Sequence, residues 1–240
     1  MNARAILLAQ WAGTLILLAV AVLAGSTGGA AAPQAVLYDQ TDNGAVSGWI
    51  GSTNFLNNIA YDSLDSQGAD DFQVPADKFW QVSTVTVHGL YTGNSGTPYV
   101  QSMLIQIYSN SGPNLPALLL YSTTIAAAQI SGLESGTFVM NLPSPVSLGP
   151  GRHWLSVQAN KQVDGESGYQ WHWRERSVPS FSPSTWRNPG DGYATGCTTF
   201  QPRLSVCDHP GLSTNPDLLF KLDGTVVDIV GQIFFPFVSR

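Results

Sequence analysis

From Val36 onward, short runs of β-branched and aromatic residues alternate with clusters of Gly, Pro, Asn and Asp. This pattern predicts short strands joined by turns, an arrangement typical of a β-sandwich. Only Ala126–Gln129 has a composition that could begin a helix. The predicted strands are Val36–Gln40, Asp71–Val74, Trp80–Tyr91, Val100–Ser109, Leu118–Ile125, Thr137–Leu142, His153–Asn160, Tyr169–Arg174 and Leu218–Leu222.

Alternation within the predicted strands indicates which side chains share a face. A regular strand would place Val82 with Thr84 and Thr86 on one face. Val85 and Val87 would then lie on the other face. No internal repeat and no interior linker interrupts the chain, so we predict one all-β, antiparallel sandwich domain over residues 33–226.

The N-terminal segment has the features of a signal peptide. Arg4 precedes a fully apolar run over residues 15–24, and small residues with Pro33 follow it. We predict a signal peptide over residues 1–32, cleaved after Ala30, Ala31 or Ala32, and hence a secreted or cell-surface protein. An uncleaved anchor is the alternative, because residues 5–24 are just long enough to span a bilayer. We expect membrane contact only through this segment, during export.

Cys197 and Cys207 are the two cysteines of the chain. In an exported protein, a pair that brackets a short loop predicts a disulfide. The alternative is two buried free thiols.

Composition excludes several classes of protein. Charged residues make up 11% of the chain, its formal net charge is −6, and its pI is about 4.9. Nucleic-acid binding needs a basic stripe, which this sequence lacks. At 43% hydrophobic residues, the chain can bury a core, so intrinsic disorder is disfavoured.

Aromatic residues concentrate in and after one predicted strand. Tyr169, Trp171 and Trp173 would share a strand face, and Trp186 and Tyr193 lie in the segments that follow. Aromatic planes beside hydrogen-bonding groups suit sugars, so these five residues are the predicted ligand-binding site. The alternative is that Trp171 and Trp173 fill the sandwich core.

Aspartates near both ends of the domain form a second candidate site. The first and last strands of a sandwich often pair, which would bring together carboxylates suited to calcium. Calcium is therefore the one possible cofactor. The alternative role of these carboxylates is turn capping. The predicted ligands are Asp39, Asp70, Asp71 and Asp217.

Several strings resemble an uncharacterised family of exported bacterial β-sandwich domains. They are Ile105–Pro116, Leu118–Ser122, Val146–Ala159, Ala69–Phe72 and Asn188–Tyr193 with Gly196 and Cys197. Members of that family occur alone, beside surface-anchoring signals, or appended to secreted hydrolases. The resemblance implies a jelly-roll-like accessory module and transfers no catalytic residue.

The last residues resemble a short tail found on exported bacterial proteins. Ile233–Arg240 combines apolar and aromatic residues with Pro236 and a terminal base. We therefore predict an apolar tail over residues 227–240 that sorts the protein or contacts a partner. The alternative is that it packs back as a final strand.

No catalytic constellation is evident. The sequence has no Gly-x-Ser-x-Gly elbow, metal-binding His pair or phosphate loop. Glu134, Glu166 and Glu175 are the only glutamates that could supply a glycosidase pair. We therefore expect a non-enzymatic exported β-sandwich that binds or presents at the cell surface or in the extracellular matrix. Its partner would be a glycan or a surface protein. A carbohydrate-binding module is the alternative, and a secreted hydrolase is the third possibility.

Overall fold

The computed structural model describes residues 34–57, 59–92, 100–162, 170–207 and 214–228. Within these ranges the fold is all-β, as predicted, and its helical segments are the 3₁₀ turns Asp62–Leu64, Ala127–Gln129 and Leu133–Ser135. The strands are β1 (Ala35–Asp39), β2 (Gly44–Gly51), β3 (Thr53–Leu56), β4 (Gln67–Val74), β5 (Lys78–Val87), β6 (Gly89–Thr92), β7 (Val100–Asn110), β8 (Pro116–Ala126), β9 (Ile130–Ser131), β10 (Phe138–Leu148), β11 (Gly151–Gln162), β12 (Gln170–Arg176), β13 (Thr185–Arg187), β14 (Gln201–Pro202), β15 (Asp217–Leu218) and β16 (Phe220–Asp228).

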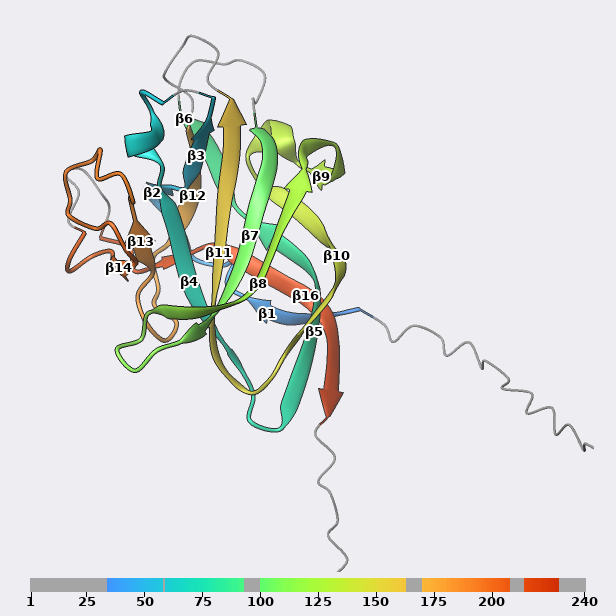
Figure 1. Cartoon of the computed structure of the whole chain (residues 1–240). Coiled ribbons are helices and arrows are strands. Elements are labelled where there is room, and N and C mark those ends of the chain that lie inside the picture. Colours follow the sequence, from blue (N-terminus) through green and yellow to red (C-terminus); the bar gives the residue numbers. More distant parts are fainter. Residues whose placement is uncertain (1–33, 58, 93–99, 163–169, 208–213, 229–240) are drawn as a thin grey trace, which may run out of the picture. The chain divides into compact units, whose positions relative to one another are not determined.

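The strands form three sheets that pack as a sandwich-like single domain (Figure 1). A five-stranded sheet has the order β1-β16-β5-β10-β9. A seven-stranded sheet has the order β14-β13-β4-β11-β7-β8, with β3 paired to β11. A four-stranded sheet has the order β15-β12-β2, with β6 also paired to β12. The pairs are antiparallel except for β3 with β11. The predicted pairing of the first and last strands is present as β1 with β16.

A chain of aromatic rings crosses the core and joins the three sheets. Phe72 of the seven-stranded sheet stacks on Trp80 and meets Phe220, both of the five-stranded sheet. Phe220 in turn lies edge-on to Trp173 of the four-stranded sheet, with ring centroids 6.2 Å apart. Burial of such large side chains is the main source of stability for a sandwich of this size.

A β-bulge changes the predicted faces of β5. The register of β5 against β16 shifts between Val82 and Thr84, so Ser83 is an extra residue in the ladder. An extra residue reverses the alternation. Val82 therefore joins Val85 and Val87 in the core instead of sharing a face with Thr84, which corrects the predicted pattern.

The predicted strand Trp80–Tyr91 is two strands in different sheets. The chain leaves the five-stranded sheet after Val87 and enters the four-stranded sheet at Gly89. Gly89 is required there by close approach, because an added Cβ would lie 2.2 Å from Nε1 of Trp171. The turn at His88 thus carries the chain from one sheet to another without a loop.

Strand β8 is the free edge of the seven-stranded sheet. Leu118, Leu119 and Leu120 are all exposed there. Register shifts against β7 fall in the same part of the strand, so the regular alternation of inward and outward side chains is lost. Bulges of this kind also make an edge a poorer template for pairing with another chain.

The last strand of the domain extends slightly beyond the predicted boundary at residue 226. Strand β16 runs to Asp228, so Val227 and Asp228 are paired with Phe79 and Lys78. The rest of the predicted tail and the predicted signal peptide lie outside the described residues. The described residues include no helix with the length and hydropathy that a membrane span requires.

Candidate functional site

The tryptophans of the predicted aromatic site lie in the core. Trp171 and Trp173 are 0% exposed and Trp186 is 4% exposed. Their indole N–H groups donate to backbone carbonyls, Trp171 to Gly136 at 2.8 Å and Trp173 to Leu219 at 2.8 Å. A sugar cannot stack on rings that other side chains cover, so the core-filling role describes these residues.

Tyr193 does not add an exposed ring to a platform either. Tyr193 lies edge-on to Trp186, with ring centroids 5.7 Å apart, and exchanges hydrogen bonds with Gln170. It is half-buried and closes one side of the core. Tyr169 lies outside the described residues.

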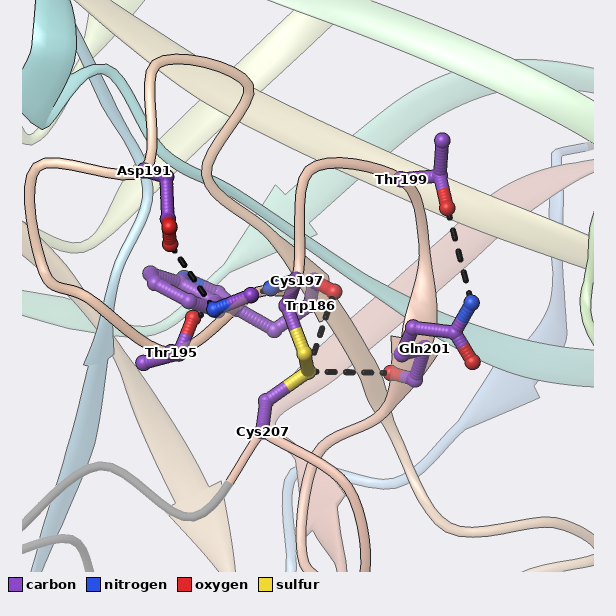
Figure 2. The surroundings of a disulfide bond; sticks show 8 residues. Trp186, Asp191, Thr195, Cys197, Thr199, Gln201 and Cys207 are labelled. Carbon is purple, nitrogen blue, oxygen red and sulfur yellow. Dashed lines mark hydrogen bonds between the residues drawn. A yellow bond between two sulfur atoms is a disulfide. The ribbon is translucent and has the colours of Figure 1, made fainter.

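The predicted disulfide is present and joins Cys197 to Cys207 (Figure 2). Both cysteines are buried, and Sγ of Cys207 contacts the carbonyl oxygens of Trp186 and Gln201. The bridge thus holds the loop against the short strands β13 and β14, which form one edge of the seven-stranded sheet.

Removal of the disulfide should lower stability moderately. The cysteines are 10 positions apart, and closing a loop of that length in the unfolded chain is worth about 2–3 kcal/mol. We expect the variant with Cys197→Ser and Cys207→Ser to lose about this much free energy of unfolding in urea titrations. A loss below about 0.5 kcal/mol would show that the bridge does not constrain the unfolded chain.

Three of the four predicted calcium ligands converge in the interior. Asp70 and Asp71 in β4 and Asp217 in β15 are 0% exposed. Their oxygens accept hydrogen bonds from the protein itself. Asp70 accepts from Leu218 N and from Gln40 Nε2, both at 2.7 Å.

The other two carboxylates of this cluster face arginines as well as backbone donors. Asp71 accepts from the backbone N of Ser182 at 3.2 Å and lies 3.4 Å from Nη1 of Arg152. Asp217 accepts from the backbone N of Ser180, and Nη1 of Arg176 lies 3.9 Å from it. Its second oxygen, Oδ1, is buried and has no hydrogen-bond partner among the described residues.

Burial raises the pKa values of all three carboxyl groups. Burial, with the neighbouring charge of Asp217, raises the pKa of Asp70 well above its usual range. Burial raises the pKa of Asp71 to about 7 and that of Asp217 to about 6, against the opposing effect of hydrogen bonds and arginines. This cluster therefore binds protons near neutral pH.

No calcium site appears among the described residues. Within the described ranges, no three His, Cys, Asp or Glu side chains are placed so that they could hold one ion. Asp39, the fourth predicted ligand, is exposed and accepts hydrogen bonds from Thr41 N and Oγ1 at 2.8 and 2.6 Å. Its geometry is that of the turn-capping alternative.

Of the three glutamates considered for a catalytic pair, one is paired with an arginine, one is exposed and one lies outside the described residues. Glu175 is fully buried, and its Oε1 lies 2.9 Å from Nη1 of Arg203. Glu134 is exposed in a 3₁₀ turn, and Glu166 lies outside the described residues. Burial lowers the pKa of His172 to about 4, so this imidazole is neutral at pH 7.

One face of the seven-stranded sheet carries polar side chains that bear no charge. One face of β7 and β11 carries Ile105, Ile107 and Leu155 in the core. The opposite face carries half-buried amide and hydroxyl side chains from three strands. We call this set the amide face: Asn54, Ser102, Gln106, Gln158 and Asn160.

Hydrogen bonds hold the side chains of the amide face in fixed positions. Asn54 donates to Oδ1 of Asn160 at 2.8 Å, and Asn160 donates to Oγ of Ser102 at 3.0 Å. Oε1 of Gln106 accepts from Gln67 at 2.7 Å and from the hydroxyl of Tyr108 at 2.8 Å. The amide nitrogen of Gln106 has no partner among the described residues, so two donors remain for a ligand.

The amide face carries no acidic or basic side chain. Residues 79–133, which include all of β7 and β8, contain no Asp, Glu, Lys or Arg. Arg187 borders the face, stacked 4.4 Å above the ring of Phe200 and bonded to Gln67. A neutral surface of fixed donors and acceptors can recognise hydroxyl groups but cannot supply acid–base chemistry.

A scan against protein-family models gives no match to this chain, and a search of curated proteins gives none. The fold and the site define the molecule as an all-β, sandwich-like domain with one disulfide. The family suggested by the sequence resemblance remains a prediction.

Proposed function

We propose that this protein is an exported, non-catalytic β-sandwich that binds at the cell surface or in the extracellular matrix. The amide face is the observation that carries the proposal. It offers five half-buried polar side chains that hydrogen bonds hold in place, and it carries no ionisable group. The predicted signal peptide supports export, and the resemblance to exported accessory domains agrees with a binding role.

Carbohydrate binding is the form of this function that the amide face favours. Neutral sugars present many hydroxyls, and each needs a donor and an acceptor in the protein. Gln and Asn side chains supply both from one group, and those on the amide face are already ordered, which lowers the entropic cost of binding. The ligand expected here is an uncharged polysaccharide that crosses β3, β11 and β7.

The buried charges support a non-enzymatic role. Glu175 is paired with Arg203 in the protein interior, and the buried Asp71 lies beside the partly exposed Arg152. A general acid or base must reach its substrate within hydrogen-bond distance. These groups serve the fold, and hydrolysis of the ligand is therefore not part of the proposed function.

Substitution on the amide face tests the proposal. We expect the variant with Gln106→Ala and Asn160→Ala to lose most of its retention in native gels that contain neutral polysaccharides. Each substitution removes donors and acceptors from the centre of the face without opening the core.

The matched control is Gln81→Ala, an exposed glutamine of β5 in the five-stranded sheet. Its retention should equal that of the unmodified protein. Equal retention of the double variant and the control would contradict the proposed role of the amide face. If the thermal midpoint of the double variant differs from that of the unmodified protein, the two substitutions should be tested one at a time.

A further inference from the structure

Trp49 is the exception among the tryptophans that the structure describes. It is 40% exposed, whereas Trp80, Trp154, Trp171, Trp173 and Trp186 are between 0% and 4% exposed. Strand β2 lies at the edge of the four-stranded sheet, so one side of it is open. The ring of Trp49 is held edge-on against His172, with ring centroids 6.3 Å apart. An exposed and oriented aromatic plane is unusual here, because the other indoles of the described residues are buried.

Arg174 lies directly opposite Trp49 in the β2–β12 ladder. Partners in an antiparallel ladder project from the same face, with Cβ atoms about 4.5–5.5 Å apart. The backbone of Arg174 is fixed from both sides, since its N donates to His88 O at 2.8 Å and its O accepts from Leu219 N at 2.9 Å. The backbone from which the arginine side chain extends is therefore fixed.

The guanidinium of Arg174 is exposed and has no partner among the described residues. Other arginines are engaged. Arg152, Arg176 and Arg203 lie within 4 Å of carboxylates. Arg174 also does not stack on Trp49 as Arg187 stacks on Phe200. Both members of the Trp49–Arg174 pair thus keep their binding surfaces open.

The surroundings do not neutralise Arg174. Asp39, Arg174 and Lys221 all lie close enough to His88 to affect its pKa, and Asp39 is the acidic group among them. Lys221 is paired with Asp223 at 3.0 Å, and Asp39, which keeps its charge while it accepts hydrogen bonds from Thr41, forms no ion pair with Arg174. A ligand with a carboxylate would therefore supply the counter-charge that Arg174 lacks.

We propose that Trp49 and Arg174 form a binding site for a carboxylate-bearing saccharide, that is, a uronic-acid unit. The C–H face of the sugar ring stacks on the indole, and the carboxylate takes two parallel hydrogen bonds from the guanidinium. Trp49 is the anchor, and Arg174 sets the preference for an acidic sugar over a neutral one. His172 positions the indole and does not touch the ligand.

This site deepens the proposed function, because it adds a ligand class on a second face of the binding domain. It belongs to the four-stranded sheet, whereas the amide face belongs to the seven-stranded sheet. The two sites are therefore tested by different variants. An intact response to neutral polysaccharide with no response to uronate would refute the Trp49–Arg174 site alone.

The test uses an oligogalacturonate trimer titrated into the purified protein, followed by calorimetry and by indole fluorescence. Arg174→Gln should weaken binding about tenfold or more, because a charge-assisted bidentate contact is lost. Trp49→Ala should abolish the fluorescence change and the binding. Arg174→Lys should recover only part of the affinity, because an ammonium cannot make the paired contact.

Lys78→Gln is the matched control, because it removes one surface cation that is already paired with Asp228 at 2.6 Å. It should bind the trimer as the unmodified protein does. Equal losses in Arg174→Gln and Lys78→Gln would overturn the proposal, since general charge would then explain the binding. Equally tight binding of an oligoglutamate peptide that survives Trp49→Ala would overturn it in favour of an acidic protein partner.

Discussion

Arg203→Met should lower the free energy of unfolding by about 3–5 kcal/mol, because it leaves a buried carboxylate without its partner. Arg203 is 1% exposed, and its Nη1 lies 2.9 Å from Oε1 of Glu175, which is 0% exposed. Nε of Arg203 also donates to Oγ of Ser184 at 3.2 Å. The measurement is denaturant unfolding at pH 7.

The double variant with Glu175→Met and Arg203→Met separates pairing from packing. It should be more stable than Arg203→Met alone, since no charge is left in the interior. Lys78→Met at an exposed ion pair should leave the thermal midpoint nearly unchanged. A loss below about 1 kcal/mol for Arg203→Met would contradict a buried, fully paired guanidinium.

Asp217→Asn should stabilise the protein by about 1–3 kcal/mol at pH 8, by about half as much at pH 5, and very little below about pH 4. Asp217 has a folded-state pKa of about 6, above the usual value for an aspartate. At pH 8 the folded state must therefore hold a buried charge beside Asp70, and this cost declines as the pH falls from the folded pKa to the unfolded value near 3.8. An amide removes the charge at every pH.

Oxygen Oδ1 of Asp217 has no hydrogen-bond partner in the described ranges, so replacing it with an amide nitrogen breaks no existing hydrogen bond. The difference in stability between variant and parent, measured at pH 5, 6, 7 and 8, isolates this group. Contributions of the buried neutral histidines cancel in that difference. A difference that does not change with pH would contradict the raised pKa.

Local patterns were sufficient to predict most strands. Runs such as Val100–Ser109 and Leu118–Ile125 match β7 and β8 closely, because β-branched and aromatic residues are concentrated there. Strand β2 was missed because its Gly residues hide the pattern, and Gly48 has a φ of 149°. The exposed Trp49 of the further site lies in this strand.

Tertiary contacts decided what local patterns could not. Alternation correctly placed Trp171 and Trp173 on one face of β12, but only the packing of three sheets shows that this face is the core. In the same way, the bulge at Ser83 depends on pairing with β16. The disulfide was predictable because both cysteines lie in one short segment.

The amide face, too, could be predicted only in part from local patterns. Alternation within one strand is enough to put Gln106 on the face opposite Ile105 and Ile107. Its neighbours Asn160 and Asn54 come from strands far along the chain, including the parallel partner β3. A sequence pattern cannot indicate such a register, so the face was visible only in the structure.

The most direct test of a non-catalytic binding role measures binding and consumption of the same ligand. The purified protein is incubated with a panel of neutral polysaccharides, and bound protein and released sugar are quantified together. We predict saturable binding that Gln106→Ala with Asn160→Ala abolishes, with all of the polysaccharide recovered intact. Release of products that scales with protein concentration, or binding to none of the panel, would contradict the account.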